Sequence, residues 1–415
     1  MAVIRPFKAL RPDKKNAHLV ASVPYDVVNR QEAKNLAKDN DLSFLRVTRA
    51  EIDLPDENDP YSKNVYEKAK ENIETLKAKA PLLVDDDPHF YIYRLIMDGN
   101  AQRGLAATFA VDDYDNDVIL KHEKTRKVKE DDRTNHIVTS ETQTGIVFLT
   151  YRGVVEINDV VNKTTDETDP LYDFTSPDGI QHTVWMIPDK FNDFLIKEFA
   201  KIDKVYVADG HHRAKSASRA REEMRKANQN HTGDEEYNYF ISVIFPAEQL
   251  NILPYNRTVR DLNNNSKEDF LNKVSEKFEV QLSEAKEPDG ITSFGMYLDG
   301  EWYRLNARDS ILASNSLSAS VGDKFDVSIL QNFLLNPILE IDDPRTNDRI
   351  DFIGGIRGTQ ELEKLVDSGK AAVAFSMYPV SVSDLMNISD AGEVMPPKST
   401  WFEPKLRDGL LTHMI

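Results

Sequence analysis

The stretch Lys204–Ala217, KVYVADGHHRAKSA, carries the clearest local structural pattern in the chain. Val205 to Ala208 favour a strand, Gly210 permits a tight turn, and the alanines from Ala214 onward favour a helix. The stretch therefore predicts a strand that turns through one glycine into a helix. Free N–H groups and the helix dipole at such a helix start favour a bound anion.

The polar residues of this turn suit phosphate. Arg213 offers a planar fork for phosphate oxygens, His211 or His212 can donate a hydrogen bond or move a proton, and Asp209 can cap the helix or help to hold a metal ion. The alternative is an ordinary helix start with surface histidines. Neighbouring histidines point apart on a strand or a helix, so they do not readily chelate one ion. Mg²⁺, held mainly by phosphates and a carboxylate, is therefore favoured over zinc.

Outward from this turn, the chain predicts strands and helices in irregular alternation. FYIYRLIM and GLAATFAVDDY predict two strands joined at Asp98-Gly99-Asn100, and residues 60–80 predict a long amphipathic helix. FLRV, from Phe44 to Val47, predicts a short strand, and YFISVIFP near residue 240 predicts a buried one. This order favours an α+β fold over a regular doubly wound sheet.

Length and composition limit the class of protein. The chain has 415 residues, which indicates two domains or three, and for two we place the boundary between residues 232 and 233. Its net charge of −18 argues against general nucleic-acid binding. It has no cysteine, so thiolate catalysis and disulfides are excluded. We find no signal peptide and no membrane-spanning run, and we expect a cytoplasmic protein without a membrane partner.

A second polar segment, KHEKTRKVKEDDR, begins at Lys121. Glu123 is a candidate general base and magnesium ligand, and His122 lies beside it. Thr125, Arg126 and Arg133 are candidate phosphate contacts. The alternative is a solvated, salt-bridged surface helix, which composition alone favours.

The C-terminal segment EVMPPKSTWFEPKLRDGLL is too apolar for a loose tail. Lys398, Ser399 and Thr400 follow two prolines that stiffen the backbone, so a rigid loop presents an ammonium group and two hydroxyls. Such a loop suits phosphate, and a docked tail with an incidental lysine is an equal alternative on chemistry alone.

Four short motifs in this order, PYDVV from Pro24, HEKT from His122, ADGHHR from Ala208 and MPPKSTWFEPKL from Met395, resemble a widespread bacterial family of unknown function. The resemblance runs from Ile4 to Leu410. It implies a ParB/sulfiredoxin-like nucleotide-binding core with large insertions, followed by a second α+β region whose C-terminal tail returns to the site. In that superfamily a Gly-x-x-Arg turn, here Gly210 to Arg213, binds ATP or CTP. Tyr25 and Asp26 of the first motif become candidates on the substrate side.

The superfamily also contains kinases of free serine. The resemblance thus implies a phosphotransferase that uses ATP or ADP with Mg²⁺, CTP being open, and acts on a small hydroxyl compound such as L-serine. In this scheme Glu123 accepts the proton and Lys398 balances charge on the transferred group, with His122 and His212 beside them. The alternatives are a nucleotide-gated switch that dimerises as ParB proteins do, and a degenerate site. A cysteine of sulfiredoxins is replaced by His211, and no ParB-type DNA-binding domain is evident.

Overall fold

The computed structural model describes residues 1–316 and 320–415 and divides them into two compact units. Unit 1 comprises Met1–Leu250 together with Pro404–Ile415, and unit 2 comprises Asn251–Glu403. Both units mix helices with mainly antiparallel sheets, so the fold is α+β as predicted. No helix of the described residues is long and apolar enough to cross a membrane.

The unit boundary differs from the predicted one between residues 232 and 233. The cause is β12 (Tyr239–Pro246), which pairs with β5 (Asn100–Ala110) on one side and β8 (Val147–Tyr151) on the other. All eight of its residues are buried, so β12 belongs inside the main sheet of unit 1. Residues 404–415 also rejoin unit 1, because β21 (Thr412–Met414) pairs with β2 (Ala9–Pro12) and β7 (Thr142–Gln143).

Unit 1 is built on a large twisted sheet with strand order β6-β11-β8-β12-β5-β4-β10-β9, and β1 pairs with β5. Its remaining strands are β1 (Ile4–Arg5), β4 (Tyr91–Met97), β6 (Ile119–Leu120), β9 (Tyr172–Thr175), β10 (Gln181–Met186) and β11 (Val205–Asp209), and β3 (Leu82–Val84) completes the small sheet with β2, β21 and β7. The predicted hairpin is confirmed, since β4 and β5 pair from Met97↔Asn100 onward and Asp98 and Gly99 both have positive φ, as a tight hairpin turn needs.

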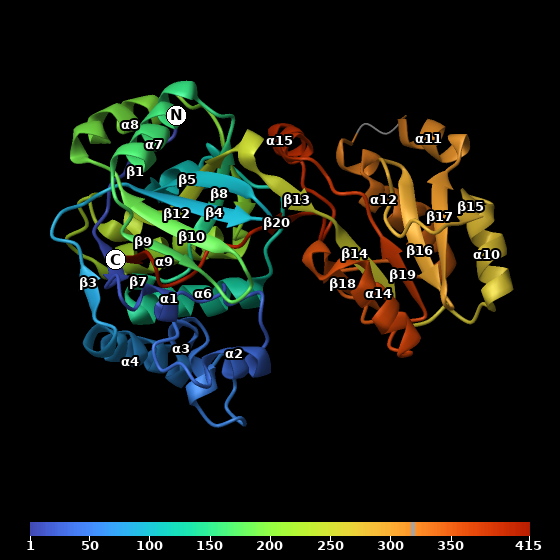
Figure 1. Cartoon of the computed structure of the whole chain (residues 1–415), viewed down its shortest axis with the longest axis horizontal. Coiled ribbons are helices and arrows are strands. Elements are labelled where there is room, and N and C mark those ends of the chain that lie inside the picture. The colour runs from blue at the N-terminus through green and yellow to red at the C-terminus, as the bar shows by residue number, and fades with distance from the viewer. Residues whose placement is uncertain (317–319) are drawn as a thin grey trace. The chain divides into compact units, whose positions relative to one another are not determined.

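Helices cover both faces of this sheet. Figure 1 shows α7 (Val155–Glu167) and α8 (Asn192–Phe199) on one side and α6 (Lys127–Ser140) on the other. Helix α9 (His211–Ala227) packs on α6, and its Ala214 and Ala217 enter the same core as Val160 of α7 and Phe199 of α8. The other helices of the unit are α1 (Ala17–Val20), α2 (Arg30–Ala37), α3 (Leu45–Thr48), α4 (Lys63–Lys79) and α5 (Val111–Asp115).

One predicted strand is wrong and one predicted helix is confirmed. The FLRV segment forms the helical turn α3, because Leu45, Val47 and Thr48 are all buried in a turn that packs on α4, and this tertiary burial outweighs local strand preference. The amphipathic stretch predicted over residues 60–80 is α4, which buries Val65, Ala69, Ile73 and Leu76 on one face.

Unit 2 has a six-stranded sheet with strand order β15-β17-β16-β19-β14-β18 and its own apolar core. The strands are β14 (Tyr255–Val259), β15 (Phe278–Leu282), β16 (Ser293–Leu298), β17 (Glu301–Ala307), β18 (Ile350–Gly354) and β19 (Val373–Ser376). A separate ladder joins β13 (Asn251–Leu253) to β20 (Trp401–Glu403). The helices are α10 (Lys267–Ser275), α11 (Asp309–Ser316), α12 (Asp326–Leu330), α13 (Asn336–Leu339), α14 (Gly358–Asp367) and α15 (Val382–Asp390).

Candidate functional site

The predicted turn between strand and helix is present at the end of β11. Asp209 ends the strand, Gly210 has φ +94°, and α9 begins at His211 with no side-chain hydrogen bond at its cap. The first N–H groups of a helix lack partners within the helix, and no described group outside α9 accepts from them at the Gly210 turn, which we define as Asp209–Arg213. A Cβ at Gly210 would lie 3.0 Å from Cζ of Arg213, so only glycine fits comfortably here.

Arg213 braces this turn from inside the fold. Its Nη2 donates to Oδ2 of Asp209 at 3.1 Å and to Oδ2 of Asp26 at 3.5 Å, and its Nη1 donates to the carbonyl of Ile146. Burial disfavours the charged guanidinium, but Asp26 and Asp209 outweigh burial and raise the pKa of Arg213. The side chain is almost fully buried, so Arg213 shapes and charges the turn and is not an open fork for a ligand.

Three histidines gather at the start of α9. The rings of His122 and His211 meet edge to face with centroids 4.3 Å apart, and the backbone N–H of His122 donates to Nε2 of His211 at 3.4 Å. Nε2 of His212 likewise accepts from the backbone N–H of Arg126 at 3.0 Å. An acceptor Nε2 in a neutral imidazole leaves the proton on Nδ1. Nδ1 of His211 lies 3.9 Å from Oε2 of Glu123.

Burial keeps these imidazoles neutral. It lowers the pKa of His211 to about 3 despite the opposing charge of Asp209, and it also lowers the pKa of His122 and of His212. At neutral pH the histidines therefore act as hydrogen-bonding groups and not as cations. The predicted cluster of Glu123, His122, His211 and His212 is brought together, although these residues come from segments almost ninety positions apart.

The other predicted residues of unit 1 lie around this cluster. Thr125 donates through Oγ1 to Oε1 of Glu130 at 2.6 Å, so its hydroxyl steadies the first turn of α6. The guanidinium of Arg133 lies 4.2 Å from the ring centroid of buried Tyr25 and bonds to Asp132. Both are thus engaged within the fold.

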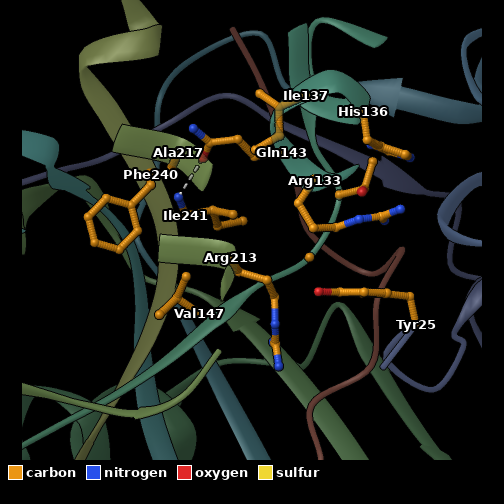
Figure 2. A pocket seen from close by; sticks show the side chains of 12 residues that line it. Tyr25, Arg133, His136, Ile137, Gln143, Val147, Arg213, Ala217, Phe240 and Ile241 are labelled. Carbon is orange, nitrogen blue, oxygen red and sulfur yellow. Dashed lines mark hydrogen bonds between the residues drawn. The ribbon is translucent and has the colours of Figure 1, made fainter. Parts of the chain in front are cut away.

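A small cavity of about 20 Å³ lies between Tyr25, Arg133 and Arg213 (Figure 2). This volume holds about one water molecule and no nucleotide. Figure 2 shows the hydroxyl of Tyr25 pointing toward the space between the two arginines.

The sequence did not single out Lys405 or Asp408. Nζ of Lys405 lies 3.4 Å from Oδ2 of Asp209. Asp408 is buried, and its Oδ2 has no hydrogen-bond partner among the described residues. Burial raises the pKa of Asp408 to about 7, with Asp26 adding to the rise and Arg213 opposing it. Lys405 falls inside the MPPKSTWFEPKL motif, yet nothing in its spacing distinguishes it from Lys398.

Arg126 is exposed, and no carboxylate of the described residues pairs with it. It is an open cation beside His212. Lys398, Ser399 and Thr400 belong to unit 2, and their part in the nucleotide site stays a prediction.

These features define a protein with an anion-suited turn on an α+β scaffold, and comparison places it in a family. Residues 4–328 match the family described as a protein of unknown function (DUF1015), and the chain belongs to that family. Comparison with curated proteins gives no match.

Several solved structures resemble the chain at a distance. A conserved hypothetical protein from Pyrococcus furiosus is 12% identical, with 74% of this chain and 94% of that chain covered and a TM-score of 0.35. A free serine kinase in complex with AMP is 12% identical, with coverage of 74% and 92% and a TM-score of 0.34. SbnI from Staphylococcus aureus is 11% identical, with coverage of 73% and 85% and a TM-score of 0.38. Such low scores transfer no property to this chain, and the predicted ParB/sulfiredoxin-like core stays a prediction.

Proposed function

We propose that the Gly210 turn binds the phosphate groups of a nucleotide and that the protein transfers a phosphoryl group to the hydroxyl of a small molecule, with free L-serine as one candidate acceptor. The observation that carries the proposal is the start of α9, where N–H groups without a partner among the described residues follow a glycine at φ +94°. A helix dipole and converging N–H donors attract phosphate oxygens. Arg213 stabilises the turn through its bond to Asp209. Arg126 lies beside His212 as an exposed cation that pairs with no described carboxylate.

Charge balance at the turn argues for a divalent cation. Asp209 and Asp26 form ion pairs with Arg213, and Lys405 forms an ion pair with Asp209. The two carboxylates are therefore already balanced by two cations. Bound phosphate adds negative charge beside these carboxylates. Glu123, whose side chain is 38% exposed, is the carboxylate that would join the phosphates in holding Mg²⁺. When bound, the ion neutralises charge on the phosphate oxygens.

Glu123 is also the proposed proton acceptor. The acceptor hydroxyl loses its proton to Glu123 as its oxygen forms a bond to phosphorus, and the bond from phosphorus to the leaving nucleotide oxygen breaks. Neutral His211, whose Nδ1 lies 3.9 Å from Oε2 of Glu123, borders the carboxylate without neutralising it. The magnesium-binding role and the proton-accepting role both use the carboxylate of Glu123, so one substitution tests both.

The first test changes Glu123 to Gln and incubates the protein with ATP, ADP or CTP, Mg²⁺ and hydroxyl metabolites that include L-serine. Mass spectrometry should detect a product heavier by one phosphate with the natural protein and at least about a 100-fold lower rate with Glu123→Gln. Calorimetry should show that nucleotide still binds to the variant. Full activity of Glu123→Gln would remove Glu123 from the scheme.

The second test compares two exposed arginines near opposite ends of the same helix. Arg126 lies beside the start of α9, and Arg225 lies in its last turn; no described carboxylate pairs with either. Arg126→Ala should weaken nucleotide binding about tenfold, or roughly 1.4 kcal/mol, whereas Arg225→Ala should leave it unchanged. Equal losses would indicate unspecific attraction. Binding without any phosphorylated product would favour a nucleotide-gated switch, and no binding would refute the proposal.

A further inference from the structure

Unit 2 contains a buried arginine that differs from the buried arginines of unit 1. Arg257, on the inner strand β14, is only 2% exposed. Arg213 and Arg407 of unit 1 are also buried, and each pairs with a carboxylate. No carboxylate of the described residues lies within 4.0 Å of the Arg257 guanidinium. A buried charge without a counter-charge is costly, so this arrangement needs a physical explanation.

The protein groups around Arg257 offset that cost only in part. Its Nη1 donates to the carbonyl of Tyr255, its Nη2 donates to the carbonyl of Lys398 at 3.1 Å, and Cζ lies 5.6 Å from the ring centroid of Phe352. These bonds use two of the five N–H donors that a guanidinium carries, counting acceptors in the described part of the chain. Burial lowers the pKa of Arg257 to about 10, against the opposing effect of Tyr255.

A second cation, the ammonium of Lys398, lies near Tyr255, the residue whose carbonyl accepts from Arg257. Nζ of Lys398 lies 5.3 Å from the ring centroid of Tyr255. Lys398 is exposed, has φ +57°, and forms no ion pair with a described carboxylate. The loop that presents it is fixed, since Oγ of Ser399 donates to the carbonyl of Pro396 at 2.6 Å. The ammonium of Lys398 thus lies over the ring of Tyr255, and the guanidinium of Arg257 bonds to the carbonyl of the same residue. Two like charges are held at one residue, an arrangement that a bound anion stabilises.

We propose that Arg257 and Lys398 form an anion-binding site in unit 2 for the phosphate or carboxylate group of a small molecule. The anion contacts the exposed ammonium of Lys398 and supplies the counter-charge that Arg257 lacks. The carbonyl of Lys398 ties the loop to Arg257, so ligand contact at the loop is transmitted to the buried guanidinium. The site lies wholly within unit 2 and is independent of the nucleotide proposed at the Gly210 turn.

Trp401 supplies a local optical signal, because its ring packs edge to face on Tyr255 with centroids 5.1 Å apart. The full chain is titrated with inorganic phosphate and, separately, with malonate as a dicarboxylate, with fluorescence and calorimetry as readouts. We expect saturable binding of one of them with a change in tryptophan emission. The favoured probe identifies the anion class. Trp401→Phe should keep the calorimetric binding and lose the emission change, which places the ligand at this site.

The decisive variants are full-length proteins, each with a single cationic side chain replaced. Lys398→Ala should weaken binding at least tenfold, whereas Lys370→Ala, at an exposed lysine elsewhere in unit 2, should not. Arg257→Met should abolish the anion-induced rise in Tm, and if it does not fold, Lys398→Ala decides alone. No binding of either anion, or equal binding by the natural protein and Lys398→Ala, would overturn the proposal. A failure of nucleotide binding at the Gly210 turn would not change the effect of Lys398→Ala on anion binding, so the two proposals can be refuted separately.

Discussion

Gly210 is the residue on which the proposed phosphate site depends most directly. Alanine at φ +94° is strained by about 1–2 kcal/mol, and its Cβ would press on Arg213 at 3.0 Å. We expect Gly210→Ala to destabilise unit 1 and to abolish nucleotide binding. Gly233→Ala is the matched control, because Gly233 has φ +102° and open space around its Cβ position. Urea unfolding should show a cost for both variants, and calorimetry should show lost binding only for Gly210→Ala.

Asp408 makes stability depend on pH in a defined direction. Burial raises the pKa of Asp408 in the folded state to about 7, above the ordinary value of about 3.9. Asp26 adds to this rise, and Arg213 and Arg133 oppose it. The folded state therefore holds this proton more tightly than the unfolded state, and stability is lost as pH rises between these two values.

Asp408→Asn removes this titration. The stability of the variant relative to the natural protein should rise between pH 5 and pH 8 by a few kcal/mol, on the order of 1.4 kcal/mol per unit of pKa shift. Urea unfolding at several pH values measures it. A difference that is constant with pH would show that the Asp408 carboxyl does not titrate in this range.

At the scale of elements, the C-terminal segment 404–415 ties the main sheet together. Arg407 bonds through Nη2 to Asp178 and through Nε to Nε2 of His182 at 3.3 Å, and its backbone N–H donates to the hydroxyl of Tyr93 at 3.2 Å. Arg407 and His182 are buried, whereas the carboxylate of Asp178 is 45% exposed and can be solvated when its partner is removed. We expect Arg407→Ala to lower the free energy of unfolding by about 1–3 kcal/mol, chiefly through the buried polar groups left without a partner.

Arg5→Ala is the control for this prediction, because Arg5 pairs with Asp234 on the surface at 3.3 Å and such pairs contribute about 0–1 kcal/mol. Chemical denaturation of both variants gives the comparison. Similar small losses in both would mean that the C-terminal segment does not hold the sheet.

The elements that the sequence predicted correctly are those with local signals. The β4–β5 turn at Asp98-Gly99 and the start of α9 at Gly210 depend on residues adjacent in the chain. The FLRV segment was predicted wrongly because its burial under α4 is a tertiary effect. Site contacts such as Asp26 with Arg213 and Lys405 with Asp209 join residues 187 and 196 positions apart, and no local pattern encodes such pairs.

At the scale of the whole molecule, unit 2 is an insertion in the chain of unit 1. Unit 1 is completed only by residues 404–415, whereas unit 2 is one continuous segment. Its two ends are neighbours, since Asn251 pairs with Glu403 in the β13–β20 ladder. The resemblance implied that the C-terminal tail returns, but the predicted boundary between residues 232 and 233 differs from the exit at Leu250, because a chain that leaves a domain changes neither composition nor periodicity there.

This topology predicts that both units fold alone. Each has its own extensive apolar core, and directly paired strand residues have Cα atoms only about 4.5–5.5 Å apart, so a short glycine linker can join Leu250 to Pro404. We expect the joined unit 1 and the isolated segment 251–403 each to give a cooperative thermal transition by circular dichroism. On the proposals above, unit 1 alone should bind nucleotide, and segment 251–403 alone should retain the anion site of Arg257 and Lys398. An unfolded unit 1 would show that its core needs unit 2, and nucleotide binding by segment 251–403 alone would move the nucleotide site away from the Gly210 turn.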